Sequence, residues 1–331
     1  MSASLAAPAP SPTVADVYAA IRPHIRRTPV IEVQVERFTG RPATVSLKLE
    51  LLQHSGSFKV RGAFANLMLR PVPADGVVAA SGGNHGAAVA YAAQRLGVPA
   101  AIFVPRISSS AKVERIRSYG ADLVVTGDSY ADALAASQAW AAEREVMSVH
   151  AFDQAETILG QATVGAELGE QVADAETVIA PVGGGGLLAG LATWYGRRVR
   201  LVGVEPLNAA TLTHALAAGM PVDVDVDSSG VAADALAPRR IGEMTFEVIH
   251  PVIARSIVVS DEDIRAAQAW LWATARVVAE PGGATALAAV LSGAYAPRDD
   301  ERVVVVVSGG NTTAVSFDSI PGASPHAPVG R

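Results

Sequence analysis

The chain has 331 residues, of which 50% are hydrophobic and 18% are charged, and its formal net charge is −6. This hydrophobic content excludes global disorder, the length allows about two domains of ~100–200 residues, and the negative charge argues against nucleic acid as a partner. There is no cysteine, which excludes disulfides, thiolate catalysis and cysteine metal ligands. We find neither a signal peptide nor an apolar run of the ~18 residues that a membrane span needs, and we expect a soluble cytoplasmic protein.

Strand-like and helix-like segments alternate along most of the chain. Short apolar runs typical of strands cover 44–50, 77–80, 101–105, 122–126, 146–150, 177–181, 200–205 and 303–307. Helical segments cover 58–70, 84–96, 109–119, 128–144, 155–173, 186–196, 208–218 and 261–294. This alternation predicts an α/β protein with parallel sheets and helices on both faces, and the continuous apolar runs are typical of strands covered on both sides.

Domain boundaries have to be inferred, because the sequence has no internal repeat and no low-complexity linker. The block 76–148 is a compact run of alternating units, and we expect it to be a small domain inserted into a larger one. The larger domain would comprise 15–75 and 149–318. We expect the Pro- and Ser-rich ends, 1–14 and 319–331, to be loose tails.

One lysine invites a chemical explanation. Only three of the 26 Lys+Arg residues are lysines, at positions 48, 59 and 112, and 26 − 3 = 23 are arginines. Lys59 lies in SGSFKVRGA, where Ser55 and Ser57 are candidate helix caps. In the first turn of a helix, the dipole would disfavour its ammonium form and make the amine more nucleophilic. Taken alone, a lysine at a helix start is more often an ordinary surface residue.

Three further motifs each follow a strand, which is where ligands bind in open α/β sheets. In PVGGGGLLAG, the glycines 183–186 allow backbone N–H groups to converge on a phosphate, although a flexible turn is the alternative. This pattern is not the GxxxxGK[ST] of nucleotide-hydrolysing loops. In ASGGNHG, the side chains of Ser81, Asn84 and His85 could bind a carboxylate or a phenolate. In VVVVVSGGN, Ser308 and Asn311 follow a very apolar strand.

Together these motifs provide a phosphate cradle, an amine and two polar strand ends. This combination indicates a pocket for a phosphorylated aldehyde that is held by an amine as a Schiff base. Pyridoxal 5′-phosphate is such a cofactor, and Lys59 would be the residue that links to it.

The motifs SFKVRGA, SGGNHG, PVGGGGLLAG and SGGN, in this order, resemble those of the fold-type II pyridoxal-phosphate enzymes, in particular the threonine/serine dehydratase and serine racemase branch. The resemblance extends from about residue 15 to residue 311. It implies a tryptophan synthase β-like fold, in which two open twisted parallel-sheet α/β domains hold the cofactor between them. It also implies an amino-acid substrate, and we expect a homodimer as the default for an enzyme of this kind.

The resemblance assigns roles to individual residues. Lys59 would be the Schiff-base lysine and the base that removes the α-proton, and Phe58 would pack against the cofactor. Asn84 would bind the ring hydroxyl, and Ser308 would face the pyridine nitrogen. The phosphate would bind to Gly183, Gly184, Gly185 and Gly186. The substrate carboxylate would bind to Ser81, Asn84 and His85.

The implied reaction is β-elimination of L-threonine or L-serine to 2-oxobutyrate or pyruvate plus ammonia. A neutral serine opposite the pyridine nitrogen makes the ring a weaker electron sink than a carboxylate would, which suits elimination and disfavours transamination. Serine racemase and 3-hydroxyaspartate dehydratase activities are alternatives within the family. A nicotinamide-dependent oxidoreductase that uses the glycine-rich turn is a remote one.

Three departures from the family pattern refine these expectations. Gly82 stands where serine racemases have a second serine, so we expect little racemisation. Glu205 fits the racemase cation site, but Thr211 stands where its aspartate is expected, so we predict no metal and treat Glu205 as structural. The chain ends soon after the catalytic part, so we expect no allosteric amino-acid-binding domain.

Overall fold

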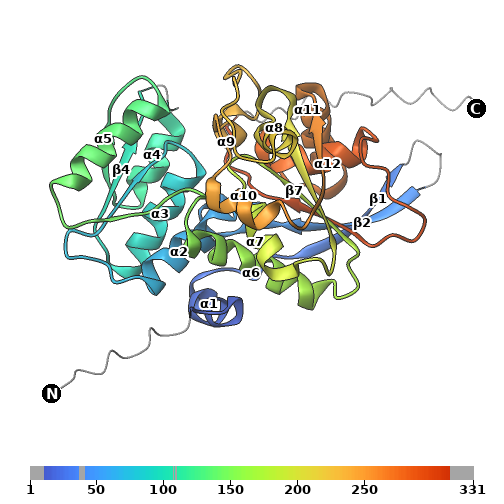
Figure 1. The fold of residues 1–331 in the computed structure, drawn as a ribbon, viewed down its shortest axis with the longest axis horizontal. Coiled ribbons are helices and arrows are strands. Elements are labelled where there is room, and N and C mark those ends of the chain that lie inside the picture. Colours follow the sequence, from blue (N-terminus) through green and yellow to red (C-terminus); the bar gives the residue numbers. More distant parts are fainter. Residues whose placement is uncertain (1–10, 37–41, 107, 109, 314–331) are drawn as a thin grey trace, which may run out of the picture.

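The computed structural model describes residues 11–36, 42–106, 108 and 110–313. It contains two sheets, which lie side by side in Figure 1. We call residues 77–148 the small part, and the other described residues the large part. The expected class is confirmed, because nearly all strand pairs in both sheets are parallel. The loose tails predicted at 1–14 and 319–331 lie mostly or entirely outside the described residues.

The large part is built on a six-stranded sheet with the strand order β1-β2-β10-β7-β8-β9. In this order, the strands are β1 (Val30–Glu36), β2 (Pro42–Leu49), β10 (Val303–Val307), β7 (Thr177–Pro181), β8 (Arg200–Pro206) and β9 (Ile253–Val259). The edge strand β1 runs antiparallel to β2 and was not predicted. Its residues alternate between exposed and buried, unlike the continuous apolar runs of the central strands.

The helices of the large part cover both faces of this sheet (Figure 1). They are α1 (Val14–Ile21), α2 (Lys59–Leu69), α6 (Ala155–Gln171), α7 (Gly186–Tyr195), α8 (Thr211–Ala218), α9 (Ala233–Leu236), α10 (Glu243–Ile249), α11 (Asp261–Ala275) and α12 (Pro281–Leu291). In β10, Val303, Val305 and Val307 face one hydrophobic core, and Val304 and Val306 face the other. This alternation explains why the strand is entirely valine.

The small part is built on a four-stranded parallel sheet with the order β5-β4-β3-β6. Its strands are β3 (Val77–Ala80), β4 (Ala100–Val104), β5 (Asp122–Val125) and β6 (Met147–Ser148), and its helices are α3 (Asn84–Leu96), α4 (Ser110–Ser118) and α5 (Tyr130–Ala142). A separate sheet within this block supports our proposal that 76–148 is an inserted domain. The two parts nevertheless share a core, because Phe64 of α2 and Val77 of β3 belong to the same buried cluster.

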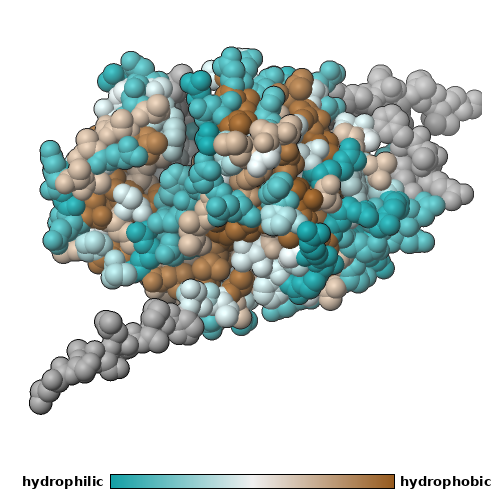
Figure 2. All heavy atoms as spheres, viewed as in Figure 1, coloured by the Kyte–Doolittle hydropathy of each residue, from teal (hydrophilic) through white to brown (hydrophobic). Residues whose placement is uncertain are grey.

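Helix α2 therefore lies between the two sheets, and it carries Lys59 at its first residue. On one side it packs on α6, where Gly62 and Gly160 face each other so closely that a Cβ on Gly160 would lie 2.6 Å from the Gly62 Cα. On the other side it packs on α3 of the small part. Figure 2 shows hydrophobic residues gathered in the lower middle of this face, where α2, α6 and α7 lie. Within the described residues, no helix is long and apolar enough to cross a membrane.

Candidate active site

Lys59 begins α2, and the residue at its N-cap is Phe58. The expectation that Ser55 and Ser57 cap this helix is wrong, because no side chain caps it. Both serine hydroxyls are buried and have no hydrogen-bond partner among the residues that the structure describes. Ser55 lies instead in a short 3₁₀ turn (His54–Gly56), with a positive φ of 58°. Two unsatisfied buried hydroxyls are costly, and they lie in the segment that leads directly into Lys59.

The Lys59 side chain is partly buried, and its amine donates a hydrogen bond to the Ala151 carbonyl, at 2.7 Å. Burial lowers the pKa of Lys59 to about 8, while the negative charge of Glu280 acts in the opposite direction. Desolvation is therefore the cause of the shift, whereas the sequence had suggested the helix dipole. A lysine with this pKa is neutral in a substantial fraction of molecules near pH 8, as a nucleophile or a base requires.

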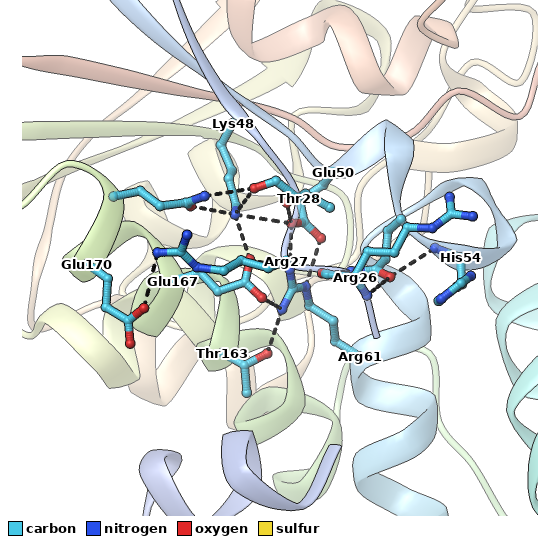
Figure 3. Close-up of polar contacts among 12 residues, drawn as sticks. Arg26, Arg27, Thr28, Lys48, Glu50, His54, Arg61, Thr163, Glu167 and Glu170 are labelled. Atoms are coloured by element: carbon cyan, nitrogen blue, oxygen red, sulfur yellow. Dashed lines mark hydrogen bonds and ion pairs between the residues drawn. The ribbon is translucent and has the colours of Figure 1, made fainter. Parts of the chain in front are cut away.

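Behind Lys59, four charged side chains form a fully buried network (Figure 3). Arg61 binds Glu50 through two hydrogen bonds of 2.8 Å and Glu167 through two of 2.9 Å. The Lys48 amine completes the network with a 2.6 Å bond to Glu167. Two cations thus neutralise two anions. The network ties α2 to β2 and α6, and it was not foreseen from the sequence.

The glycine-rich turn joins β7 to α7 in a closely packed environment. A Cβ on Gly184 would overlap the ring of Phe152, and one on Gly185, whose φ is +92°, would lie 2.9 Å from the Thr245 hydroxyl. The Thr245 hydroxyl donates to the Gly184 carbonyl at 2.8 Å, and the Thr211 hydroxyl donates to the Gly183 carbonyl at 3.2 Å. Among the described residues, the backbone N–H groups of 183–186 donate no hydrogen bond to a backbone carbonyl outside their helix. The loop thus has donors available and no room for side chains, which fits a phosphate at the start of α7.

The second loop leads from β3 into α3, whose N-cap is Gly83. The Ser81 hydroxyl accepts a bond from the Gly83 N–H at 3.1 Å. His85 is buried, and its Nε2 lies 2.9 Å from the Val149 carbonyl, so Nε2 carries the proton. Burial, followed by the positive charge of Lys59, lowers the pKa of His85 to about 3. The imidazole is therefore neutral and its N–H is already used, which leaves the Ser81 hydroxyl and the backbone N–H groups at the start of α3 as donors toward an anion.

Gly82 has no room for a side chain in this arrangement. A Cβ at position 82 would overlap the Ser108 hydroxyl, which comes from the segment before α4. A hydroxyl thus occupies the space beside Gly82, although it is supplied by a different residue from the one that the family pattern would suggest.

The third loop follows β10. Ser308 is buried, its carbonyl accepts from the Phe58 N–H at 3.2 Å, and its hydroxyl lies 3.4 Å from the Gly282 carbonyl. Beside it lies a carboxyl group that the sequence analysis did not single out. Glu280 accepts a 2.5 Å bond from the Asn84 amide, and burial raises its pKa to about 7. A Cβ on Gly309 would overlap this carboxyl group, which explains the glycine there. The segment VVAEPGGA could have indicated a buried carboxyl group, since a glutamate in an apolar run is unusual.

Glu205 lies at the end of β8 and acts as a helix cap. Its carboxylate accepts from the backbone N–H groups of Leu212 and Thr213, at 2.6 and 2.8 Å, and from the hydroxyls of Thr213 and Ser256, at 2.7 and 2.9 Å. Both oxygens are thus bound by donors from the protein. Among the described residues, no group of three or more His, Asp or Glu side chains has an arrangement that could hold a metal ion. These contacts describe Glu205 as a carboxylate that caps α8, and the absence of a metal stays a prediction.

The two parts of the molecule also meet in front of the second loop. Lys112 of α4 forms an ion pair with Asp234 of α9, and a Cβ on Gly83 would lie 3.5 Å from the Asp234 carbonyl. Arg115, one turn later on α4, donates to Asn311 of the large part. The small part is thus linked to the large part directly beside the predicted substrate loop.

An amine of lowered pKa, a glycine loop without room for side chains and polar strand ends between two α/β parts are features expected of an enzyme that binds pyridoxal 5′-phosphate. Residues 21–309 match the family described as "Pyridoxal-phosphate dependent enzyme". The chain belongs to this family, and its cofactor is pyridoxal 5′-phosphate.

The sequence is similar to those of curated relatives over nearly the whole length of both chains. The phenylserine dehydratase of Ralstonia pickettii is 37% identical over 312 residues, which are 92% of this chain and 94% of the relative. The catabolic L-threonine dehydratase of Staphylococcus aureus is 33% identical over 320 residues, which are 95% and 91% of the two chains. The structure of maize serine racemase is similar, with a TM-score of 0.83 and 31% identity over 91% of this chain and 93% of that one.

Proposed function

We propose that this enzyme is an ammonia-lyase that dehydrates L-threonine or L-serine to 2-oxobutyrate or pyruvate plus ammonia. The observation that carries the proposal is the partly buried Lys59 amine, whose pKa is lowered to about 8 and whose positive charge acts on His85 at the start of α3. The names of the relatives, threonine dehydratase and L-threonine ammonia-lyase, support the same reaction.

Each residue of the site has a separate task in this reaction. The glycine loop 183–186 would hold the cofactor phosphate, Ser308 would face the pyridine nitrogen, Phe58 would pack on the ring, and Asn84 would bind the ring hydroxyl. When bound, the cofactor supplies an electron-withdrawing ring that acidifies the α-carbon of the substrate. The Lys59 amine takes the α-proton. The substrate carboxylate binds at Ser81 and at the backbone N–H groups of Asn84 and His85, where the positive end of α3 favours a negative charge.

The test is the release of 2-oxo acid by the purified holoenzyme. We expect 2-oxobutyrate from L-threonine or pyruvate from L-serine, each with one equivalent of ammonia. Lys59→Ala should lose at least about a thousandfold in kcat, because both the anchoring amine and the base are removed. Arg106→Gln, at an exposed ion pair with Asp128, is the control and should keep the wild-type rate. If Lys59→Ala eliminates at the wild-type rate, or if the wild type releases no 2-oxo acid, the proposal is wrong.

L-threo-3-Phenylserine is a second candidate substrate, because the relative with 37% identity is a phenylserine dehydratase. The reaction would be the same elimination, with phenylpyruvate as its product. Comparing kcat/KM for the three hydroxy amino acids ranks them directly. Gly82 led us to expect little racemisation. Chiral chromatography, which measures the D-serine formed from L-serine, tests this expectation.

The homodimer stays a prediction. Light scattering of the purified holoenzyme after size-exclusion chromatography gives its mass, which should be twice the 34.0 kDa of one chain.

A further inference from the structure

Asn84 is the third member of a chain of four polar side chains that crosses the molecule. Arg115 of α4 donates to the Asn311 side-chain oxygen. The Asn311 Nδ2 donates to the Asn84 Oδ1 at 2.6 Å, and the Asn84 Nδ2 donates to the Glu280 carboxyl at 2.5 Å. These residues come from α4, the segment after β10, α3 and the residue before α12. We call this set, Arg115–Asn311–Asn84–Glu280, the amide relay.

The donors and acceptors in the amide relay can be assigned from Arg115 alone. No prior choice is needed of which end of the Asn311 or Asn84 amide is the oxygen. A guanidinium group can only donate, so Asn311 must turn its oxygen toward Arg115. Its nitrogen then faces the other way, and it also donates to the Ser55 carbonyl at 2.8 Å. Because the Asn311 nitrogen can only donate, Asn84 must accept with its oxygen. The Asn84 nitrogen therefore points to Glu280 whether or not that carboxyl group is protonated.

The inner end of the amide relay is tightly packed. Glu280 is 4% exposed, and its carboxyl group also accepts from the Asn311 backbone N–H. Gly309 has no room for a Cβ beside Glu280, and Gly283 has none beside the Gly309 carbonyl. The cations that act on Glu280 are Lys59, Lys112 and Arg115. In so little space a rotated amide would leave a polar atom unpaired, which is costly when buried.

We propose that Asn311 is a positioning residue that fixes the Asn84 side-chain amide in one orientation, so that the second N–H of Asn84, and not its oxygen, is available to the ring hydroxyl of the cofactor. Glu280 takes the first N–H and closes the amide relay. This inference rests on the role proposed for Asn84 in the cofactor site. It gives the final asparagine of SGGN a task that the sequence motif alone does not supply.

The experiment measures cofactor binding, not turnover. Apoenzyme is titrated with pyridoxal 5′-phosphate by fluorescence, and the pH midpoint of the visible absorption band is measured for the holoenzyme. Asn311→Leu keeps the approximate volume but removes both hydrogen-bonding groups. Asn311→Asp keeps the shape and still accepts from Arg115, but its carboxylate cannot donate to Asn84. Asn208→Leu and Asn208→Asp make the same changes in η4 (Leu207–Ala209), away from the amide relay.

We expect both Asn311 variants to bind the cofactor about tenfold more weakly and to shift the midpoint of the absorption band, because Asn84 loses the donor that sets its orientation. The Asn208 variants should match the wild type in both measurements. Unchanged affinity and an unchanged midpoint in both Asn311 variants would overturn the proposal, as would equal changes in the Asn208 variants. These readouts do not involve a substrate, so they remain decisive even if no 2-oxo acid is released by the wild type.

Discussion

The three lysines of the chain occupy three different environments, and only one of them suits covalent chemistry. Lys48 is fully buried but is bound by Glu167, and Lys112 is paired with Asp234 at the contact between the two parts. Lys59 is partly buried, and its amine donates to the neutral Ala151 carbonyl and lies over the Phe58 ring. Its pKa is lowered to about 8, chiefly by desolvation. The rarity of lysine and the Ser-Gly-Ser turn before it singled out Lys59, but the surroundings of each amine decide its role.

His85 makes the stability of the protein depend on pH. Its pKa is about 3 in the folded chain, because of burial and then Lys59, against 6.5 for a free histidine. Between these values the unfolded chain binds a proton that the folded chain does not. His85 therefore lowers the free energy of unfolding as the pH falls, by about 1.4 kcal/mol per unit within this window. Glu280, with its pKa raised to about 7 by burial, acts in the opposite sense.

A variant isolates the contribution of His85. His85→Gln keeps a donor for the Val149 carbonyl but cannot titrate. Urea unfolding of both proteins is measured from pH 7 to pH 4. The free energy of unfolding of the wild type should fall relative to that of the variant as the pH falls. A stability difference that stays constant over this range would show that His85 titrates normally in the folded chain.

At the scale of elements, α2 is fixed in place by glycine contacts and by the buried charges. Gly62 and Gly160 allow α2 and α6 to touch, and Arg61, only two residues after Lys59, binds both Glu50 and Glu167. A buried ion network contributes little net stability compared with well-packed apolar residues, but removing one partner is costly. We infer that the network serves to fix the position of α2, the helix that carries Lys59.

Arg61→Ala is expected to lower the free energy of unfolding by about 3–5 kcal/mol, since it leaves two buried carboxylates with one lysine between them. Arg27→Ala is the matched control, because it removes an arginine from the exposed pair with Glu170 and should cost less than about 1 kcal/mol. Urea denaturation of the two variants gives both values. Equal costs would contradict the view that the network holds α2.

At the scale of the whole molecule, the site is formed where two sheets meet. The carboxyl ends of β3, β7 and β10 bring the three motif loops together, and α2 supplies the lysine from between the sheets. The small part meets the large part through Lys112–Asp234 and Arg115–Asn311. The relative position of the two parts therefore sets the distance between Lys59 and the loop after β3, which we propose binds the substrate.

Lys112→Gln is expected to raise KM about three- to tenfold while changing the free energy of unfolding by less than about 1 kcal/mol. The reason is that the Lys112–Asp234 pair is partly exposed but lies beside Gly83, in the loop that we propose binds the substrate. Steady-state kinetics and urea unfolding check both parts of this expectation. Asp234→Asn should behave in the same way, and an unchanged KM in both variants would rule out a role for this pair.

The sequence by itself determined the fold class, the cofactor and the lysine candidate, because each depends on a local pattern: strand and helix periodicity, a glycine run after a strand, and a lysine after a Ser-Gly-Ser turn. The tertiary structure decided the rest, because the contacts join residues far apart in the chain. Lys48 and Glu167 are separated by 119 positions, and Asn84 and Asn311 by 227. The caps expected at Ser55 and Ser57 failed for the same reason: Ser57 pairs with Gly309, so the path of this segment is set by a distant strand end and not by local capping. Burial, which gives Lys59, His85 and Glu280 their pKa values, exists only once these distant segments have come together.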